Sequence, residues 1–411
     1  MSEYILKDFP ARHELIDWYR HNKTDRVLEV NAHLHTPYSF SAFRNVEQIF
    51  NMAVSERVGV LGINDFFVAD GFEAFYKHSL RTRIFPLFNI EFIGLLIEEQ
   101  RSDIRVNDPI NPGRTYFCGK GLRYPFELEP QYDCILRNVR YESQMQVKEM
   151  VEKANQLLRT LDPGLILKYS EVKRKYAKEL VRERHLARAI REIIFSKYMS
   201  ESERAIILHK LYGGKDSVVS QDDEAALENE IRANLLKAGG KAFIHEDPDA
   251  FLPIPQIIEI ILNAGGIPCY PVLLDDKDGN CTEYETDMQL LLNELEARNI
   301  CCIELIPGRN DITLLKEFVT FFHENKFIIT FGTEHNTPDL KPISVTARSN
   351  TPLDDDLKRI SWEGACVIAA HQFLHARGEE GYVKLDGQVN RQHLDEFILL
   401  GKAVIEKFLT G

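Results

Sequence analysis

The feature that most restricts the fold of this chain is a repeated alternation of short buried strands with amphipathic helices. A strand is predicted at residues 26–31, followed by a helix at 46–56 and a second strand at 58–63. A further helix at 72–78 leads to a third strand at 84–88. The same alternation returns later, with helices near 254–264, 286–297 and 312–325 and strands at 267–270, 301–306 and 327–331. Such alternation is typical of parallel βα units and predicts an α/β barrel.

Between these two parts, residues 92–240 are mostly charged and carry helical patterns instead of βα units. The helices predicted there cover residues 144–160, 172–196, 201–211 and 222–237. We interpret this stretch as a helical subdomain inserted into the barrel. The predicted domains are a first part of the barrel at 1–98, a mostly helical insertion at 99–240, a second part of the barrel at 241–340 and a C-terminal helical extension at 341–411.

The charge and the cysteines narrow the classes of partner and compartment. The net charge is −13, and an acidic protein does not attract nucleic acid through general electrostatics, because phosphate contacts need an excess of Lys and Arg. The seven Cys are odd in number and include the neighbours Cys301 and Cys302, which does not suit a disulfide framework. Residues 1–20 show neither a signal sequence nor a membrane span. We therefore expect a cytoplasmic protein with a small-molecule substrate and no membrane partner; its oligomeric state stays open.

Two histidines end the first predicted strand. His33 and His35 are two residues apart, and side chains at that spacing in a strand point to the same side. Two imidazoles so placed can bind one metal ion or two neighbouring ions. The motif alone is weak, because 13 His in 411 residues give about 0.4 such pairs by chance. Two surface or capping histidines explain the isolated motif equally well.

Polar side chains also follow three later strands of the predicted barrel. Asp65 ends the second strand, Glu91 ends the third, and Glu334 and His335 end the last. In a parallel barrel the carboxyl ends of all strands lie on one face, where active sites form. Carboxylates and imidazoles gathered there suit Mn²⁺, Zn²⁺ or Fe²⁺. Asp65 and Glu334 taken singly are better explained as helix N-caps, but their joint placement favours a metal site.

These motifs resemble those of the polymerase-and-histidinol-phosphatase (PHP) superfamily, in order and in approximate spacing. Residues 33–39, His-Leu-His-Thr-Pro-Tyr-Ser, resemble the first PHP motif, usually HxHTxxSDG. Residues 86–92 resemble the P-G-I-E-F segment, whose Glu often bridges metals, and residues 332–335 resemble the terminal G-S-D-x-H motif. The TDH, G-G-x-x-x-A-H-P and I-E motifs correspond to residues 63–66, 265–271 and 303–304. The resemblance implies a distorted (β/α)7-type TIM-like barrel that hydrolyses phosphate esters with divalent metal ions.

The inserted stretch adds to the resemblance. Residues 182–187, Arg-Glu-Arg-His-Leu-Ala, resemble an R-P-H-I-A segment in the PHP branch that cleaves nucleotide and oligonucleotide phosphates. In that branch a helical subdomain interrupts the barrel, and its Arg and His face the substrate phosphate. The resemblance implies that Arg184 and His185 bind phosphate, for which a guanidinium fork is well suited. The Pro of the segment is missing, and composition alone favours a solvated helix face for Arg184.

Three positions depart from the family pattern in ways that reduce the metal site. Phe40 stands where the Asp of the first motif is expected, and Phe66 stands where the TDH histidine is expected. Tyr270 takes the place of the A-H-P histidine. A phenylalanine cannot ligate a metal, and a tyrosine ligates only as a phenolate. The remaining ligands therefore suit one or two divalent ions rather than a full cluster.

The last motif also departs from the pattern. Glu334 replaces its Asp, and His335 follows without the usual gap, so that Asn336 takes the position of the His. The predicted site consists of His33, His35, Glu91 and Glu334 as metal ligands, Asp65 and His335 as proton-handling groups, and Arg184, His185, Arg309 and Tyr270 as substrate-binding groups.

Three functions are compatible with this sequence. The first is a metal-dependent phosphoesterase acting on a small phosphate ester, such as a nucleotide or a sugar phosphate. The second is a catalytically degenerate PHP barrel that serves as a ligand-binding or structural module, because barrel stability resides in the core while chemistry resides in the loops. The third is another metal-dependent hydrolase on an amidohydrolase-like barrel, which also opens with an HxH strand.

Overall fold

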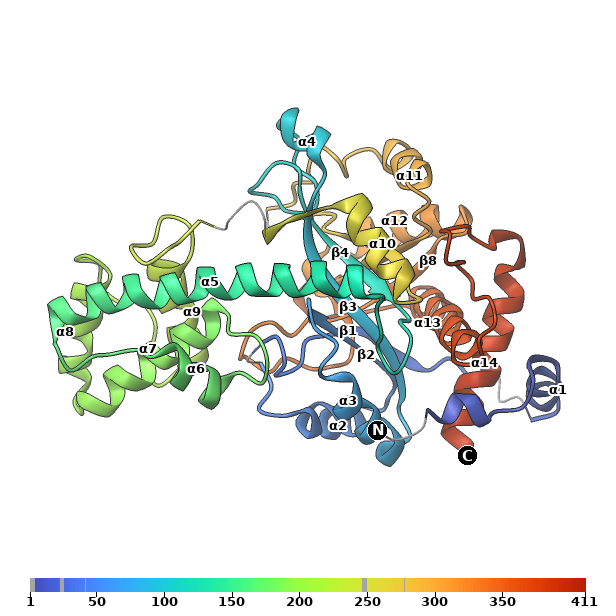
Figure 1. Ribbon diagram of the computed structural model, residues 1–411, viewed down its shortest axis with the longest axis horizontal. Helices are drawn as coiled ribbons and strands as arrows, with labels where there is room; N and C mark the ends of the chain where they lie inside the picture. The colour runs from blue at the N-terminus through green and yellow to red at the C-terminus, as the bar shows by residue number, and fades with distance from the viewer. Residues whose placement is uncertain (1–3, 23–25, 41, 246–249, 277) are drawn as a thin grey trace.

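The computed structural model (Figure 1) describes residues 4–22, 26–40, 42–245, 250–276 and 278–411. It is a mixed α/β protein in which a sheet curls into a nearly closed barrel, and this confirms the predicted TIM-like fold. The strands follow one another around the barrel as β1 (Glu29–Leu34), β2 (Val58–Phe66), β3 (Phe85–Leu95), β4 (Arg114–Lys120), β6 (Ile267–Val272), β7 (Cys302–Leu305) and β8 (Ile328–Phe331). A two-residue strand, β5 (Leu252–Pro253), pairs with the end of β3.

Helices cover the outside of the barrel, and several start where a polar side chain caps the first turn. Such caps begin α2 (Val46–Ser55) at Asn45, α11 (Met288–Ala297) at Asp287, α12 (Ile312–Glu324) at Asp311 and α13 (Asp355–Ala376) at Asp354. The other helices around the barrel are α1 (Arg12–Asn22), α3 (Phe72–Thr82), α4 (Ile97–Arg101), α10 (Ile254–Asn263) and α14 (Leu394–Thr410). Short elements complete this part of the chain: η1 (Ile5–Asp8), η4 (Pro307–Arg309), η5 (Arg348–Asn350), η6 (Arg391–His393), β9 (Thr346–Ala347) and β10 (Thr351–Pro352).

The barrel closes between β1 and the segment that follows β8. The backbone N–H of His35 donates to the carbonyl of Glu334 at 3.0 Å, and the N–H of Glu334 donates to the carbonyl of His33 at 2.9 Å. Gly332 permits this approach, because a Cβ at that position would lie 2.3 Å from the Cβ of His33. The closure holds the HxH segment and the last motif side by side at one end of the barrel.

Strand β4 runs antiparallel to both of its neighbours, whereas β1, β2 and β3 pair in parallel, as do β6, β7 and β8. Its Cys118 is in register with Glu91 of β3 and with Cys269 of β6. The helical pattern of residues 99–240 does not predict this strand, because its alternation is short and lies within a stretch dominated by charged helices. The strand places side chains of that stretch inside the barrel.

The inserted helices project away from the barrel, to the left in Figure 1. They are α5 (Pro130–Leu161), α6 (Tyr169–Tyr176), α7 (Glu183–Lys197), α8 (Glu201–Leu211), α9 (Glu224–Ile231) and the π-helical turn η2 (Arg232–Leu236). They enclose a hydrophobic cluster of their own. The long helix α5 joins the two cores, since Leu136 and Val139 pack with the barrel and Val147 and Leu158 pack within the insertion. The domain boundaries given above remain predictions.

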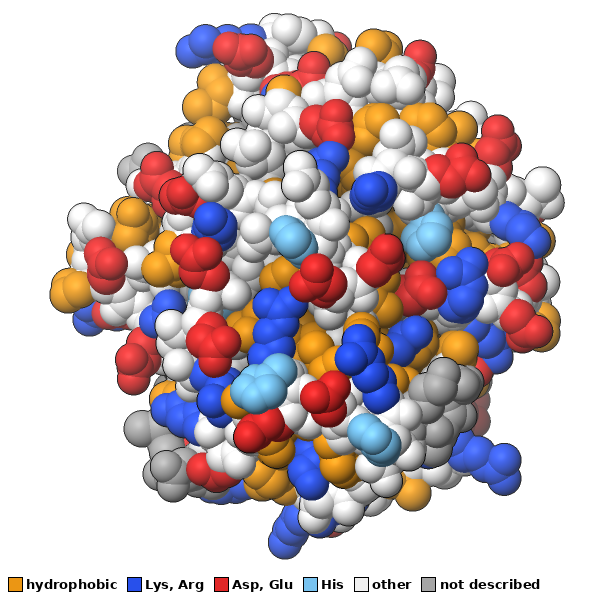
Figure 2. Space-filling model, turned by 90° about the vertical axis from the view of Figure 1, so that its right-hand side faces the viewer, with side chains coloured by type: hydrophobic (Ala, Val, Ile, Leu, Met, Phe, Trp, Pro, Cys, Tyr) orange, Lys and Arg blue, Asp and Glu red, His pale blue; other side chains and the backbone are white. Residues whose placement is uncertain are grey.

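The C-terminal helices cover the side of the barrel opposite the insertion. α13 packs against β8 and β1, and α14 packs against α13 and α1. Figure 2 shows this face, where acidic and basic side chains are interspersed among hydrophobic ones. Within the ranges that the structure describes, no helix combines the length and apolar character needed to cross a membrane.

Candidate metal centre

The interior of the barrel is polar at the end where His33 lies. Asn64 faces inward from β2, because its Nδ2 atom lies 3.0 Å from Nδ1 of His33. Side chains alternate along a strand, so Phe66 lies on the same inner face as Asn64. Phe66 is in register with Glu91 of β3, which therefore also points inward. Three consecutive strands thus direct polar side chains to one place.

His33, His35 and Glu91 form a compact triangle of potential ligand atoms. Nε2 of His33 lies 3.5 Å from Nε2 of His35 and 3.7 Å from Oε2 of Glu91, and Nε2 of His35 lies 3.3 Å from that same oxygen. A tetrahedral ion with bonds of about 2.0–2.1 Å holds its ligand atoms roughly 3.4 Å apart. The triangle therefore has the spacing of three ligands around one ion.

The hydrogen bonding of these buried groups is incomplete in a way that fits a metal ion. All three side chains are at most 3% exposed. Among the residues that the structure describes, Oε2 of Glu91, the oxygen of the triangle, has no hydrogen-bond partner, and neither has Nδ1 of His35. A buried carboxylate oxygen without a partner is unfavourable unless a cation is bound beside it. The residues present thus fit a divalent ion held by two imidazoles and one carboxylate.

Burial shifts the titration of two of these residues in opposite directions. It raises the pKa of Glu91 well above its usual value, and the negative charges of Glu334 and Glu304 raise it further. Burial also lowers the pKa of His35 well below its usual value, with a further contribution from His33. A bound cation would favour the ionised carboxylate of Glu91 and the neutral imidazole of His35, which are the forms that ligate metals.

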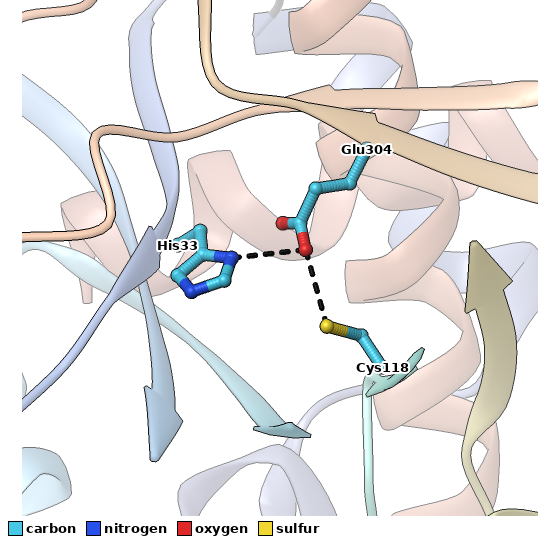
Figure 3. Close-up of side chains that lie close together, drawn as sticks. All are labelled: His33, Cys118 and Glu304. Carbon is cyan, nitrogen blue, oxygen red and sulfur yellow. Dashed lines mark hydrogen bonds and ion pairs between the residues drawn. The ribbon is translucent and has the colours of Figure 1, made fainter. Parts of the chain in front are cut away.

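A second group of potential ligands, His33, Cys118 and Glu304, lies on the other side of the same imidazole (Figure 3). Nδ1 of His33 is 2.9 Å from Oε1 of Glu304, and Sγ of Cys118 is 3.2 Å from that oxygen. The ammonium of Lys120 donates to the other oxygen of Glu304 and lies 3.4 Å from Oδ1 of Asn64. Lys120 and Glu304 are both fully buried.

The ion pair inside the barrel keeps both partners charged. Burial acts to raise the pKa of Glu304, but His33 and Lys120 outweigh it and lower that pKa to about 2. Burial acts to lower the pKa of Lys120, but the carboxylate of Glu304 outweighs it and the pKa is raised. Lys120 and Cys118 are missing from the predicted site because they lie on the unpredicted strand β4. The predicted site contains Asp65 and not its neighbour Asn64, although alternation along the strand places Asn64 on the same face as Phe66.

Asp65 lies on the opposite face of β2 from Asn64. One of its oxygens accepts the backbone N–H of Thr36 at 2.7 Å, and its carboxylate also accepts the hydroxyls of Thr36 and Ser39. Burial raises the pKa of Asp65 to about 7 in spite of these hydrogen bonds. Asp65 therefore stabilises the turn that follows His35 and lies away from the triangle of ligand atoms.

Glu334 and His335 do not belong to the triangle of ligand atoms. The carboxylate of Glu334 forms an ion pair with Arg309. Nδ1 of His335 lies 2.7 Å from Oγ1 of Thr333, its Nε2 lies 2.8 Å from the carbonyl of Lys341, and its ring stacks on Phe43. Both ring nitrogens of His335 thus already have partners outside the metal group.

Tyr270 points to the outside of the sheet. Its neighbour Cys269 is in register with Cys118, which faces Glu304 inside the barrel, so alternation directs Tyr270 outward. The hydroxyl of Tyr270 donates to Oε1 of Glu285 at 2.7 Å. The structure therefore does not bring Tyr270 to the other predicted site residues.

Two aromatic rings occupy the surroundings of His35. The ring of Phe40 lies 4.3 Å from that of His35 between centroids, and Phe66 stacks on it at 5.4 Å. The guanidinium of Arg182 lies over both phenylalanines. This side of His35 therefore offers hydrophobic contacts and no further ligand atoms.

The insertion reaches the mouth of the barrel through the start of α7. Arg184 is only 8% exposed, and its Nη2 lies 3.5 Å from Oδ1 of Asn336. Within the described part of the chain its Nε has no hydrogen-bond partner, and burial, with a contribution from Arg232, lowers the pKa of Arg184 to about 10. Arg184 therefore does not lie on a solvated helix face, which composition alone favours. His185 is fully buried, and its Nδ1 accepts the N–H of Arg182 at 2.9 Å, as a helix cap.

A pocket of about 200 Å³ opens beside the metal group. Its lining includes His33, Glu91, Glu304, Arg309, Glu334 and Asn336. Asp65, His335 and Tyr270 are not part of this lining. A ligand in the pocket would meet two members of the triangle, His33 and Glu91, together with the carboxylates of Glu304 and Glu334 and the guanidinium of Arg309.

Comparison with solved structures supports the fold. No protein-family model matches this chain, and no curated protein does so either. One similar structure is a protein from Bifidobacterium adolescentis, provisionally described as a metal-dependent phosphoesterase; it shares 15% identity at a TM-score of 0.50, over 82% of this chain and 96% of that one. Another is an amidohydrolase from Chromobacterium violaceum, solved with sulfate and no metal, at 13% identity and a TM-score of 0.47, over 81% of this chain and 96% of that one.

Proposed function

We propose that this protein is a metal-dependent hydrolase that cleaves a small phosphate ester, with one divalent ion held by His33, His35 and Glu91. The observation that carries the proposal is the triangle of two imidazole nitrogens and one carboxylate oxygen, with sides of 3.3, 3.5 and 3.7 Å. Three protein ligands beside an open pocket are typical of catalytic sites, whereas structural sites are closed by four. A divalent ion there supplies Lewis-acid activation of water and of the phosphoryl group.

Other residues of this chain orient the candidate ligands and form the pocket. Nδ1 of His33 lies 2.9 Å from Oε1 of Glu304, and a proton on Nδ1 leaves the lone pair of Nε2 for a ligand; the amide nitrogen of Asn64 lies 3.1 Å from this Nε2. The contacts of Phe40 and Phe66 hold the ring of His35 in place and exclude water from that side. The pocket is lined by His33 and Glu91 of the triangle, and this is where substrate would enter.

Two arginines support a phosphate ester over a neutral amide as the substrate, in a pocket whose lining also carries the carboxylates of Glu91, Glu304 and Glu334. Arg309 lies in the lining, and its ion pair with Glu334 leaves the side chain 46% exposed. Arg184 reaches Asn336, a second lining residue, and its buried Nε–H has no partner in the ranges that the structure describes. Guanidinium groups recognise phosphate oxygens through paired N–H donors. The modest volume of the pocket favours a monoester over a polymer.

Metal analysis and a substrate panel test the proposal. Protein purified without chelator and without added metal should contain a divalent ion, and with Mn²⁺ or Zn²⁺ it should hydrolyse a member of a panel of p-nitrophenyl phosphate, sugar phosphates and nucleotides. The His33→Ala/His35→Ala variant should lose both metal and activity. His209→Ala, which removes an exposed histidine paired with Asp216, is the matched control.

Three results would count against the proposal. Protein that holds no metal and stays inert with added Mn²⁺ and Zn²⁺ would favour a degenerate barrel with a binding or structural role. Full activity in the double variant would place the chemistry elsewhere. Hydrolysis of amides in the same panel without hydrolysis of phosphate esters would favour an amidohydrolase.

A further inference from the structure

Two groups of potential metal ligands share one residue. His33 belongs to the group with His35 and Glu91 and also to the group with Cys118 and Glu304. In each group the ligand atoms lie within 4.8 Å of one another. The protein therefore offers two adjoining places for a cation, one on each side of the imidazole of His33.

A neutral imidazole can serve only one of these places as a ligand, because it has one lone pair and one N–H. Its Nε2 faces Glu91 and His35, and its Nδ1 faces Glu304 at 2.9 Å. A proton on Nδ1 satisfies Glu304 and leaves the lone pair of Nε2 for an ion in the first group. The second group would then offer a cation only the carboxylate of Glu304 and the thiol of Cys118.

Lys120 already supplies a positive charge to the second group. Its ammonium forms an ion pair with Glu304, and both side chains are fully buried inside the barrel. Burying a lysine is unfavourable unless a paired charge compensates it, so this lysine is held by the carboxylate. A divalent ion bound to Glu304 would lie close to the ammonium and be strongly repelled by it.

We propose that Lys120 is a built-in cation that takes the place of a second divalent ion and restricts the site to a single ion bound by His33, His35 and Glu91. The inference rests on the proposed metal centre. It makes Lys120 a residue that sets the metal stoichiometry, through Glu304, without touching the substrate. The carboxylate of Glu304 then orients His33 instead of ligating metal.

Metal stoichiometry at saturation tests the inference. Equilibrium dialysis against Mn²⁺, and separately against Zn²⁺, should give one ion per chain for the wild type. Lys120→Met removes the ammonium with little change of volume and should raise the stoichiometry to two, because Glu304 and Cys118 become available. The Lys120→Met/Glu304→Gln variant is the matched control, since it removes both charges, and it should return to one ion per chain.

The outcomes separate this inference from the proposed function. A wild type that binds no ion would overturn the metal centre itself. A wild type that binds two ions, or a Lys120→Met variant that still binds one, would overturn the role of Lys120 and leave the metal centre standing. If Lys120→Met is unstable without metal, its melting temperature should rise more with Mn²⁺ than that of the wild type, and an equal rise would contradict the inference.

Discussion

Nδ1 of His33 lies 2.9 Å from Oε1 of Glu304, on the opposite side of the imidazole from the Nε2 atom that faces Glu91 and His35. The carboxylate also accepts from Cys118 and Lys120, so its position is fixed from three directions. An outer carboxylate of this kind orients a ligating histidine and increases its basicity. The relationship connects a buried ion pair in the barrel core to the geometry of the candidate metal group.

Glu304→Gln should weaken metal binding without removing a ligand. Losing the carboxylate should reduce the affinity for Mn²⁺ or Zn²⁺ roughly 10- to 100-fold, as outer-sphere changes do. Lys120 would also lose its charged partner, so the free energy of unfolding should fall by about 3–5 kcal/mol. Dialysis with a competing chelator and urea unfolding measure the two effects. Glu283→Gln, which breaks an exposed pair with Arg105, is the control, and an equal loss in that variant would contradict the prediction.

Glu91→Gln should separate the stability of the metal-free protein from its response to metal. Burial raises the pKa of Glu91, so a neutral amide in its place should leave the metal-free protein at least as stable as the wild type near pH 7.5. Metal at about 100 times its dissociation constant should stabilise the wild type by roughly 3 kcal/mol and the variant not at all. Thermal unfolding with and without Mn²⁺ measures this. Glu73→Gln, on the surface of α3, should retain the full response.

Asp65→Asn should change how stability depends on pH. The folded-state pKa of Asp65 is about 7, above the ordinary value of 3.8. The folded state therefore holds the proton more tightly than the unfolded state, and the stability that this provides is complete below pH 3.8 and is lost as the pH rises through 7. An asparagine mimics the protonated acid, because its amide can donate to the hydroxyl of Thr36 while its oxygen accepts from Ser39. The variant should match the wild type near pH 4 and exceed it by up to about 4 kcal/mol at pH 8.

Urea unfolding at the two pH values gives the comparison, and equal slopes in both proteins would refute the shift. The same variant also tests the assignment of Asp65 to proton transfer. Because the carboxylate anchors the turn at Thr36 and Ser39 and does not line the pocket, we expect Asp65→Asn to retain most of the phosphatase activity.

The period of two along a strand explains both what the sequence predicts about this site and where the prediction misleads. It places His33 and His35 on one side of the chain, and the structure brings them together with Glu91. At the end of β2, however, neighbouring side chains point to opposite faces of the sheet. Asn64 therefore faces the metal group, and Asp65 faces away from it. Tyr270 stands on the outer face of β6 for the same reason.

The alternation of strands and helices along the sequence does not predict strand β4. Its seven residues run antiparallel and precede a long charged helix, so no repeating unit marks them as part of the barrel. Cys118 and Lys120 enter the interior only through this strand. A lysine in the centre of a barrel is not expected from composition, because it is stable there only opposite Glu304, which is 184 residues away in the chain.

Arg184→Met should impair substrate binding more than turnover. The guanidinium donates to Asn229 and to Asn336, of which Asn336 lines the pocket. Its buried Nε–H has no partner among the described residues, and a phosphate oxygen can accept a hydrogen bond from it. Methionine keeps the apolar stem but removes the charge. We expect KM for p-nitrophenyl phosphate, and the inhibition constant of inorganic phosphate, to rise roughly 10- to 100-fold, the equivalent of about 1.4–2.8 kcal/mol.

The stability of this variant gives an independent check. Burial lowers the pKa of Arg184, which means that its charge is held at some expense to the folded state, so Arg184→Met should be as stable as the wild type or more so. Arg188→Met, one turn further along α7 and paired with Glu192, is the matched control and should leave KM unchanged. A rise in KM in both variants would point to the overall charge of the helix, and no rise in either would remove Arg184 from the substrate site.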